Sequence, residues 1–315
     1  MFETSWIAKA KDSNPSNSRY NGTMRAIALI VVGAMAACAL PCSIFYVYDG
    51  KHALAGDSED WIDPNTQVWF VPKTATTYGV VYFGFGKGDY PDGGIRRALK
   101  GRELPEGGVI NIEPSDAYGF PQAGMNDKGL FFGGAATDTV KTTNDKPKFD
   151  GFFADYVMRH CATVPEALKV IEQYDVGMSQ GQILLGDRFG NSAVIEPGNK
   201  VLPGNGKYQI ITNFRLSATR NVSCPRYKKL DAALTACDSL TVPFARDAIA
   251  SVGRGPTRDS LEKKVPGTQY SVVFDLTNGV AHLYNRFDFR RAVQIDVKKE
   301  TSGTPRAVTM AELFR

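Results

Sequence analysis

The chain has 315 residues, of which 43% are hydrophobic and 22% are charged, and its formal net charge is only +4. This is the composition of an ordinary globular protein with enough apolar residues to bury a large core. The small net charge and the lack of a sustained Lys/Arg stripe argue against a nucleic-acid partner.

The first informative segment is an apolar run from Ala26 to Leu40, which follows Met24-Arg25 and a polar stretch over residues 1–23. A positive start, a short apolar segment and small residues after it are typical of a secretory signal. The run is shorter than the about 20 residues that a membrane span needs. We therefore predict an exported protein, periplasmic or secreted, whose mature chain has no stable membrane span. Residues 1–23 are either a polar extension or an untranslated segment, if synthesis starts at Met24.

Two kinds of processing fit this region. Ala34-Met35-Ala36 is an A-x-A cleavage site, and a cut there leaves a short stub, residues 37–41, ahead of Cys42. Alternatively, residues 35–38 are an imperfect match to a lipid-anchor pattern, with Cys38 as the lipidated residue. The predicted organisation is an extension over 1–23, a signal peptide and short propeptide over 24–41, and a single domain over 42–315.

A β-hairpin is predicted directly after this signal. β-branched and aromatic residues flank the dipeptide Asp49-Gly50, which is a strong signal for a tight two-residue turn. Counting outward from such a turn places Cys42 opposite Asp57, with Cβ atoms about 4.5–5.5 Å apart. Glu59 and Asp60 follow just beyond. Local geometry therefore predicts carboxylates close to the Cys42 thiol.

Cys42 is a candidate nucleophile because processing can make it the first residue of the chain. A thiol with its ordinary pKa is only a few per cent ionised at neutral pH. A free α-amine has a pKa of about 8 and can accept the thiol proton without a histidine. The simpler alternative is that Cys42 is a small core residue that opens a strand.

The rest of the chain alternates between blocks of strands and blocks of helices, which predicts an α+β fold with antiparallel sheet. A glycine-rich stretch, Gly84–Gly88, is predicted to be a loop, because it lacks the full spacing of a phosphate-binding loop. Asn126 is predicted to serve a turn. A closing hairpin is predicted to turn at Asn278-Gly279. Strands are predicted at 67–70, 78–83, 109–112, 130–135, 182–185, 192–196, 208–212, 270–276 and 280–284, and helices at 152–160, 163–174, 225–237 and 243–252.

Several short segments carry a resemblance to a known family through their order and spacing. They are Cys42 at the start of a strand, Gly56–Trp61, Gly124–Leu130, Gly186–Glu196, Thr212-Asn213 and Cys224–Tyr227. Together they resemble the choloylglycine hydrolase and penicillin V acylase family of N-terminal nucleophile (Ntn) hydrolases. The resemblance covers roughly Cys42 to Tyr284. It implies a four-layer αββα sandwich with mostly antiparallel sheets.

The resemblance also implies roles for four residues. Cys42 would be the nucleophile, Asp60 the acid that positions it, Asn213 a donor to the oxyanion, and Arg226 a support for the charge network or the substrate. Each also has a plainer structural interpretation, since Asp60 could end a strand, Asn213 a turn and Arg226 a surface helix. No metal and no organic cofactor is implied.

Two positions depart from the family pattern. Asp57 stands where the bile-salt enzymes have an arginine, and Ala136 stands where they have a polar side chain near a strand end. An oxyanion contact at Ala136 would have to come from its backbone N–H. Asp57, Ala136 and Trp61 are predicted to border the substrate, and the two departures weigh against bile-salt and penicillin V substrates more than against the reaction type.

The predicted function is hydrolysis of the C–N bond of a linear, non-peptide N-acyl amide through an acyl-enzyme on Cys42. Candidate substrates are bile-salt-like conjugates, penicillin V-like amides, acyl-homoserine lactones and N-acyl amino acids. Two alternatives stay open: an exported lipoprotein that is anchored through Cys38 and binds acyl ligands without catalysis, and an acyltransferase of the same fold. The predicted partner is a small-molecule substrate, and a homo-oligomer is left open.

Overall fold

The computed structural model describes residues 42–61, 65–86, 119–143, 145–149, 151–255 and 267–315. All of them lie in the compact unit Leu40–Arg315. The predicted export signal and the predicted strand at 109–112 lie outside the described residues and stay predictions.

Two sheets form the middle of the protein. One has six strands in the order β10-β1-β2-β11-β12-β13, and the other has eight in the order β14-β3-β4-β5-β6-β7-β8-β9. Each pairing between neighbouring strands of these described sheets is antiparallel. The six-stranded sheet consists of β10 (Tyr208–Ile211), β1 (Ser43–Tyr48), β2 (Ala53–Trp61), β11 (Gly267–Asp275), β12 (Val280–Asn285) and β13 (Asp288–Asp296). The eight-stranded sheet consists of β14 (Arg306–Thr309), β3 (Thr66–Val71), β4 (Val80–Gly86), β5 (Gly119–Asn126), β6 (Leu130–Ala135), β7 (Gln182–Asp187), β8 (Ser192–Glu196) and β9 (Lys200–Pro203).

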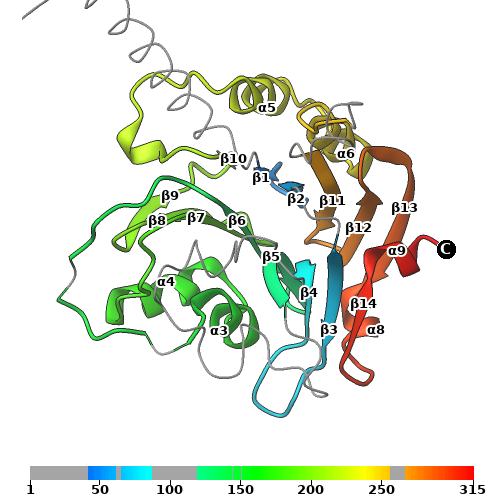
Figure 1. Ribbon diagram of the computed structural model, residues 1–315, viewed down its shortest axis with the longest axis horizontal. Coiled ribbons are helices and arrows are strands. Elements are labelled where there is room, and N and C mark those ends of the chain that lie inside the picture. The colour runs from blue at the N-terminus through cyan, green and yellow to red at the C-terminus, as the bar shows by residue number, and fades with distance from the viewer. Residues whose placement is uncertain (1–41, 62–64, 87–118, 144, 150, 256–266) are drawn as a thin grey trace, which may run out of the picture. The chain divides into compact units, whose positions relative to one another are not determined.

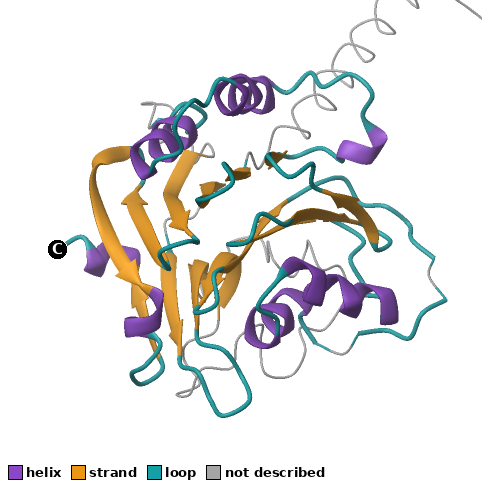
Figure 2. Ribbon diagram, turned by 180° about the vertical axis from the view of Figure 1, so that it is seen from behind, coloured by secondary structure: helices purple, strands orange, loops and turns teal. Residues whose placement is uncertain are grey.

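Helices cover the outer face of each sheet (Figures 1 and 2). The longer ones are α3 (Phe153–His160) and α4 (Val164–Gln173), which pack on the eight-stranded sheet, and α5 (Pro225–Thr235) and α6 (Val242–Ala250), which pack on the six-stranded sheet. Three shorter elements are η1 (Leu216–Ala218), α8 (Val297–Glu300) and α9 (Met310–Leu313). The order of the layers, helix, sheet, sheet and helix, confirms the predicted four-layer αββα sandwich. Within the described ranges, no helix combines the length and apolar character that a membrane crossing requires.

β1 lies between two cores because successive side chains of a strand point to opposite faces. Ile44 and Tyr46 belong to the core between the sheets, whereas Phe45 and Val47 belong to the core under α5 and α6. Gly56 on β2 leaves room for the Phe45 ring, which lies 2.4 Å from where a Cβ of Gly56 would stand. Alternation therefore directs the side chain of Cys42, two residues before Ile44, into the layer between the sheets.

The first hairpin has a longer turn than the sequence predicted, and the predicted register is wrong. Tyr48 pairs with Ala53, so that Asp57 lies opposite Ile44 and not opposite Cys42. The reason is Asp49, whose Oδ1 accepts hydrogen bonds from the backbone N–H groups two and three residues on, at 2.9 and 2.7 Å. This Asx turn closes the loop over four residues. The slip is two residues, so each side chain keeps its predicted face.

Other predicted elements need smaller corrections. Gly84 and Gly86 belong to strand β4 rather than to a loop, and the side chain of Gln67 lies 2.4 Å from where a Cβ of Gly86 would stand. Glycine is therefore used here for close packing within the sheet. The predicted turn role of Asn126 is confirmed, since its Oδ1 accepts from the N–H groups of Lys128 and Leu130. Strands β5, β9, β13 and β14 were not predicted.

Candidate active site

Cys42 stands immediately before β1, at the edge of the layer between the sheets. Its side chain is buried, with 3% exposure. The last pair of the hairpin is Ser43 with Ser58, so the next position outward brings Cys42 opposite Glu59. The Cys42 thiol donates to Glu59 Oε1 at 3.4 Å. The carboxyl beside the candidate nucleophile is therefore Glu59, which the sequence analysis placed only in the vicinity.

The inner face of β2 carries two buried acids that have no cationic hydrogen-bond partner among the described residues. Asp57 and Glu59 are 0% and 2% exposed, and alternation along β2 directs both toward the core between the sheets. Among the described residues, neither carboxylate oxygen of Asp57 has a hydrogen-bond partner, nor has Glu59 Oε2. Burial, and secondarily the charge of Asp60, raises the pKa of Asp57 to about 8. Burial and the charge of Asp57 likewise raise the pKa of Glu59.

These surroundings also hold the thiol in its protonated form. Burial, followed by the charges of Glu59, Asp57 and Asp60, raises the pKa of Cys42 well above its ordinary value. Tyr270 on β11 pairs with Glu59, and its hydroxyl has no hydrogen-bond partner among the described residues. With residues 1–41 still attached, the thiol therefore needs a proton acceptor before it can attack a carbonyl.

Asp60 lies on the opposite, helix-facing side of β2 and has several compensating partners. Its Oδ1 accepts a hydrogen bond from the Thr268 hydroxyl at 2.5 Å. Burial raises the pKa of Asp60 to about 7, while the Thr268 hydrogen bond and the charges of Arg226 and Arg254 limit the rise. Asp60 is close enough to Cys42 for its charge to raise the pKa of the thiol. Among the described residues, however, Asp60 is hydrogen-bonded to Thr268 and not to the thiol.

Arg226 joins three parts of the site from the N-terminal turn of α5. Its Nη1 donates to the carbonyl oxygen of Cys42 at 2.5 Å and to Ser43 Oγ at 2.7 Å. Its Nη2 donates to Asn213 Oδ1 at 2.9 Å. Asn213 in turn donates from Nδ2 to the carbonyl oxygen of Ala136 at 3.0 Å. The planar guanidinium, with donors in a fixed fork, suits this bridging position.

Trp61 ends β2 and begins a row of aromatic rings beside the inner acids. Its ring centroid lies 5.7 Å from that of Phe85, and the centroid of Phe85 lies 6.3 Å from that of Tyr270. The buried indole nitrogen of Trp61 has no hydrogen-bond partner among the described residues. The three rings form an apolar surface beside the inner acids. The Trp61 indole nitrogen and the Tyr270 hydroxyl are its polar atoms without a described partner.

Solved structures of two enzymes share this arrangement of sheets and helices. Two variants of the conjugated bile acid hydrolase from Clostridium perfringens superpose with TM-scores of 0.60 and 0.59, at 15% and 17% sequence identity, over 85% of this chain and 96% of theirs. Penicillin V acylase from Agrobacterium tumefaciens superposes with a TM-score of 0.54 at 16% identity, over 82% of this chain and 86% of its own. The chain shares the fold of these hydrolases. No family model matches the sequence, and neither does any curated protein.

The fold that the family resemblance implied is therefore confirmed, and the structure brings most of the predicted site residues together. Cys42, Asn213 and Arg226 are linked by hydrogen bonds, and Ala136 joins them through its carbonyl oxygen. Asp57 and Trp61 lie on the same strand as Asp60. The catalytic and substrate-binding roles assigned to these residues stay predictions.

Three contributors to this region were not predicted: Glu59 as the thiol partner, Thr268 as the partner of Asp60, and Tyr270, which pairs with Glu59. Thr268 and Tyr270 come from β11, more than 200 residues away in the chain, and no local pattern indicates that β11 pairs with β2. Glu59 could have been found, because an Asx turn at Asp49 predicts the observed register.

Within the described part of the chain, no group of three or more His, Cys, Asp or Glu side chains could hold a metal ion. The acids of β2 illustrate why, since Asp57 and Glu59 point to one side of the strand and Asp60 to the other.

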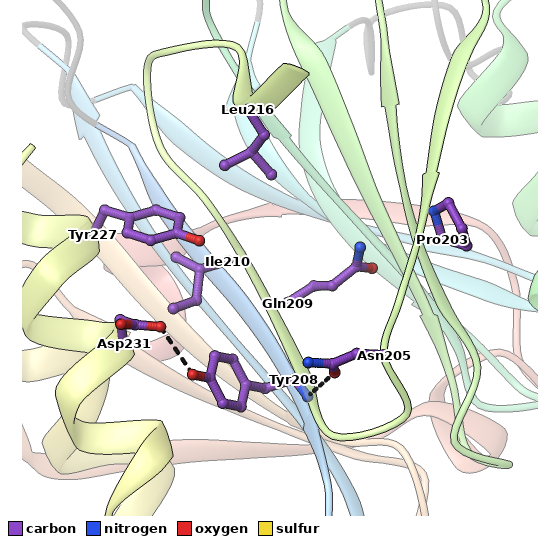
Figure 3. A pocket seen from close by; sticks show the side chains of 8 residues that line it. All are labelled: Pro203, Asn205, Tyr208, Gln209, Ile210, Leu216, Tyr227 and Asp231. Atoms are coloured by element: carbon purple, nitrogen blue, oxygen red, sulfur yellow. Dashed lines mark hydrogen bonds between the residues drawn. The ribbon is translucent and has the colours of Figure 1, made fainter. Parts of the chain in front are cut away.

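A separate groove follows strand β10 and helix α5, with a cavity volume of about 270 Å³. Figure 3 shows the side chains that line it, with Tyr208 donating a hydrogen bond to Asp231 at 2.8 Å. They are Pro203, Asn205, Tyr208, Gln209, Ile210, Leu216, Tyr227 and Asp231. None of the predicted site residues is among them.

Proposed function

We propose that the protein is a cysteine N-terminal amidase, which hydrolyses the C–N bond of a linear N-acyl amide after Cys42 has become its first residue. The observation that carries this proposal is the position of Cys42 at the start of a central strand of an αββα sandwich. Its thiol points between the sheets, and its carbonyl oxygen is held by Arg226.

The proposed reaction uses the freed amino group as the base. Removal of residues 1–41 turns the nitrogen of Cys42 into an α-amine, which can accept the thiol proton. The sulfur attacks the amide carbonyl, the amine leaves with a proton, and water hydrolyses the acyl-enzyme. Asp60 would orient the ammonium form from the helix-facing side of β2.

Asn213 can serve the developing oxyanion through the second N–H of its side-chain amide. A side-chain amide has two N–H donors, and one of them is engaged with the carbonyl oxygen of Ala136. Arg226 fixes the amide group by its hydrogen bond to Asn213 Oδ1. This locks the orientation of Asn213, as a preorganised oxyanion donor requires.

The side chains of the inner face favour some of the candidate substrates over others. Asp57 and Glu59 lie there without a described cation, and the aromatic row of Trp61, Phe85 and Tyr270 lies beside them. An anionic group of a substrate would find no described cation to pair with at this place, and burying an unpaired charge is costly, whereas an apolar acyl chain would pack on the rings. We therefore rank neutral N-acyl amides, such as acyl-homoserine lactones, above anionic bile-salt conjugates, penicillin V and N-acyl amino acids.

The test is a panel of these four substrate classes assayed on the exported protein, with the mature N-terminus determined by mass spectrometry. We expect a chain that begins at Cys42, with turnover of at least one class that is lost in Cys42→Ala. Active protein that retains Leu40-Pro41 ahead of Cys42 would exclude the mechanism, and lipidation of Cys38 would favour the anchored lipoprotein. Added amines that compete with water for the acyl group would indicate an acyltransferase.

A further inference from the structure

The uncleaved chain lacks the base on which the proposed amidase depends. While residues 1–41 are attached, the nitrogen of Cys42 belongs to a peptide bond and is not basic. Burial and the neighbouring acids raise the pKa of the thiol, which therefore keeps its proton at neutral pH. If the thiol itself removes the preceding segment by attacking the Pro41 carbonyl, another group must accept its proton.

Glu59 is in position to do so. Its Oε1 accepts a hydrogen bond from the Cys42 thiol at 3.4 Å, within the range expected when sulfur is the donor. Glu59 is almost fully buried, and its second oxygen has no hydrogen-bond partner among the described residues. The Asx turn at Asp49 sets the register that places these two residues opposite each other.

We propose that Glu59 accepts the thiol proton of Cys42 during removal of the preceding segment, so that two bases act in succession, first this carboxylate and then the α-amine of Cys42. The inference rests on the proposed function, in which the second base, the α-amine, serves amide hydrolysis. It assigns a catalytic role to Glu59, because Glu59 contacts the reacting sulfur atom.

The steps balance without any additional reactant except water. The thiol proton moves to the Glu59 carboxylate as the sulfur bonds to the Pro41 carbonyl carbon. The C–N bond to Cys42 then breaks, and Glu59 returns the proton to the departing nitrogen, which becomes the α-amine. Water attacks the resulting thioester, the C–S bond breaks, and the released peptide ends in a carboxylate at Pro41.

The groups around Glu59 make it a stronger base than an ordinary carboxylate. They are Cys42 before β1, Asp57 and Asp60 on β2, and Tyr270 on β11, and the cations Arg226 and Arg254 face Asp60 on the other side of β2. Burial and Asp57 raise the pKa of Glu59, while the hydrogen bond from the thiol lowers it. The fraction of ionised Glu59 therefore grows with pH over a range above that of an ordinary carboxyl group, and self-cleavage should accelerate over the same range.

The experiment follows cleavage of the full 315-residue chain by intact mass spectrometry, in wild type and in Glu59→Gln. We expect Glu59→Gln to slow cleavage before Cys42 at least about 100-fold, because proton transfer by a placed side chain contributes about 10²–10⁴-fold. Glu196→Gln is the matched control. Glu196 is a buried glutamate in the other sheet that accepts a hydrogen bond from the Ser217 N–H at 3.1 Å, and its variant should cleave at the wild-type rate.

A second comparison, of wild type and Glu59→Gln in a chain that already begins at Cys42, distinguishes the role of Glu59 from that of the α-amine. A chain that already begins at Cys42, released from a fusion by a site-specific protease, carries the α-amine whatever stands at position 59. In this form Glu59→Gln should lose at least about 10-fold less in N-acyl amide hydrolysis than it loses in self-cleavage, because the α-amine supplies the base. A far-UV circular dichroism spectrum like that of wild type shows that the variant folds. Wild-type cleavage rates in Glu59→Gln, equal losses in both forms, or a wild-type chain that never cleaves itself would each overturn the inference. If the wild-type chain beginning at Cys42 hydrolyses no N-acyl amide, the proposed function fails, while the cleavage rates still decide the role of Glu59.

Discussion

The two faces of strand β2 bury carboxylates equally deeply but treat their charge in opposite ways. On the inner face, Asp57 and Glu59 lie beside the Cys42 thiol without a described cation. On the outer face, Asp60 accepts a hydrogen bond from Thr268 and lies within the fields of Arg226 and Arg254. One strand thus separates an uncompensated acidic layer from a compensated network.

The difference teaches that burial alone does not fix the chemistry of a group in this site. Two cysteines show the contrast most clearly. Burial and acids raise the pKa of Cys42 on the inner side. Burial also acts to raise the pKa of Cys224, but a hydrogen bond from Thr212, backbone N–H groups and the charge of Arg226 outweigh it, and the pKa is lowered. The same small region therefore holds one suppressed thiol and one activated thiol.

The largest expected effect comes from breaking the outer network at Asn213. Asn213→Ala removes the amide that Arg226 orients, and with it the proposed donor to the oxyanion. We expect turnover of an N-acyl amide to fall by about 10²–10³-fold, or about 2.7–4 kcal/mol in the barrier, as for other oxyanion donors. Steady-state kinetics on the chain that begins at Cys42 measures this. Unchanged turnover would remove Asn213 from the catalytic site.

The next effect concerns the stability of the inner face as a function of pH. Asp57 has a pKa of about 8 when folded, against about 4 when unfolded. Between about pH 4 and pH 8 the folded chain holds a proton on Asp57 that the unfolded chain has lost. The stabilisation that this proton binding gives is fully present below about pH 4 and is lost as the pH rises through 8. We expect the uncleaved Cys42→Ala chain to unfold at a lower temperature at pH 8.5 than at pH 5.5.

Asp57→Val sharpens that prediction, because it removes the charge from a position that faces Ile44 and Val272. Replacing buried charges by well-packed apolar side chains often stabilises a protein by about 1–4 kcal/mol. We expect a gain of this order at pH 8.5, with a smaller gain at pH 5.5, measured by denaturant unfolding. An equal gain at both values would show that the effect is packing and not charge.

Sequence reasoning succeeds in this molecule where a periodic apolar pattern marks an element. It fails where a side chain reshapes a turn, where a strand is polar, or where the partner is distant in the chain. The α+β class, the strand after Cys42 and the helix at Pro225 follow from short local segments, whereas the αββα layering was predicted only through the family resemblance. The register of the first hairpin does not, because the side chain of Asp49 extends the turn by two residues. The edge strand β13 was not predicted, because its residues are mostly polar and exposed and do not alternate regularly between apolar and polar.

Distance along the chain explains why most of the site could not be predicted from local patterns. Asn213 and Arg226 could be placed only through the family resemblance, because their meeting with Cys42 depends on the pairing of β10 with β1 and on the packing of α5. Thr268 and Tyr270 carry no signal of their own, because strand pairing across more than 200 residues is decided by the whole sheet.

A smaller effect is expected from weakening the compensation of Asp60. Thr268→Val keeps the shape of the side chain but removes the hydroxyl that donates to Asp60 and accepts from the Arg254 N–H. We expect the free energy of unfolding to fall by about 1–3 kcal/mol, the usual cost of a buried polar atom left without a partner. Thr268→Ser is the control, since it keeps the hydroxyl. Equal losses in both variants would assign the effect to the missing methyl contacts.

The smallest effect tests the contrast between the two thiols directly. In the uncleaved chain at pH 7.5, we expect iodoacetamide to modify Cys224 about 10-fold faster than Cys161, whose pKa is raised to about 11 by burial and by Glu166. Buried Cys42 should react more slowly still. Peptide mass spectrometry over a time course gives the rates, and Thr212→Val should slow Cys224 a few-fold by removing the hydrogen bond to its sulfur. If Cys42 reacts first, the acidic inner face does not suppress its thiol, and the need for Glu59 as a separate base disappears.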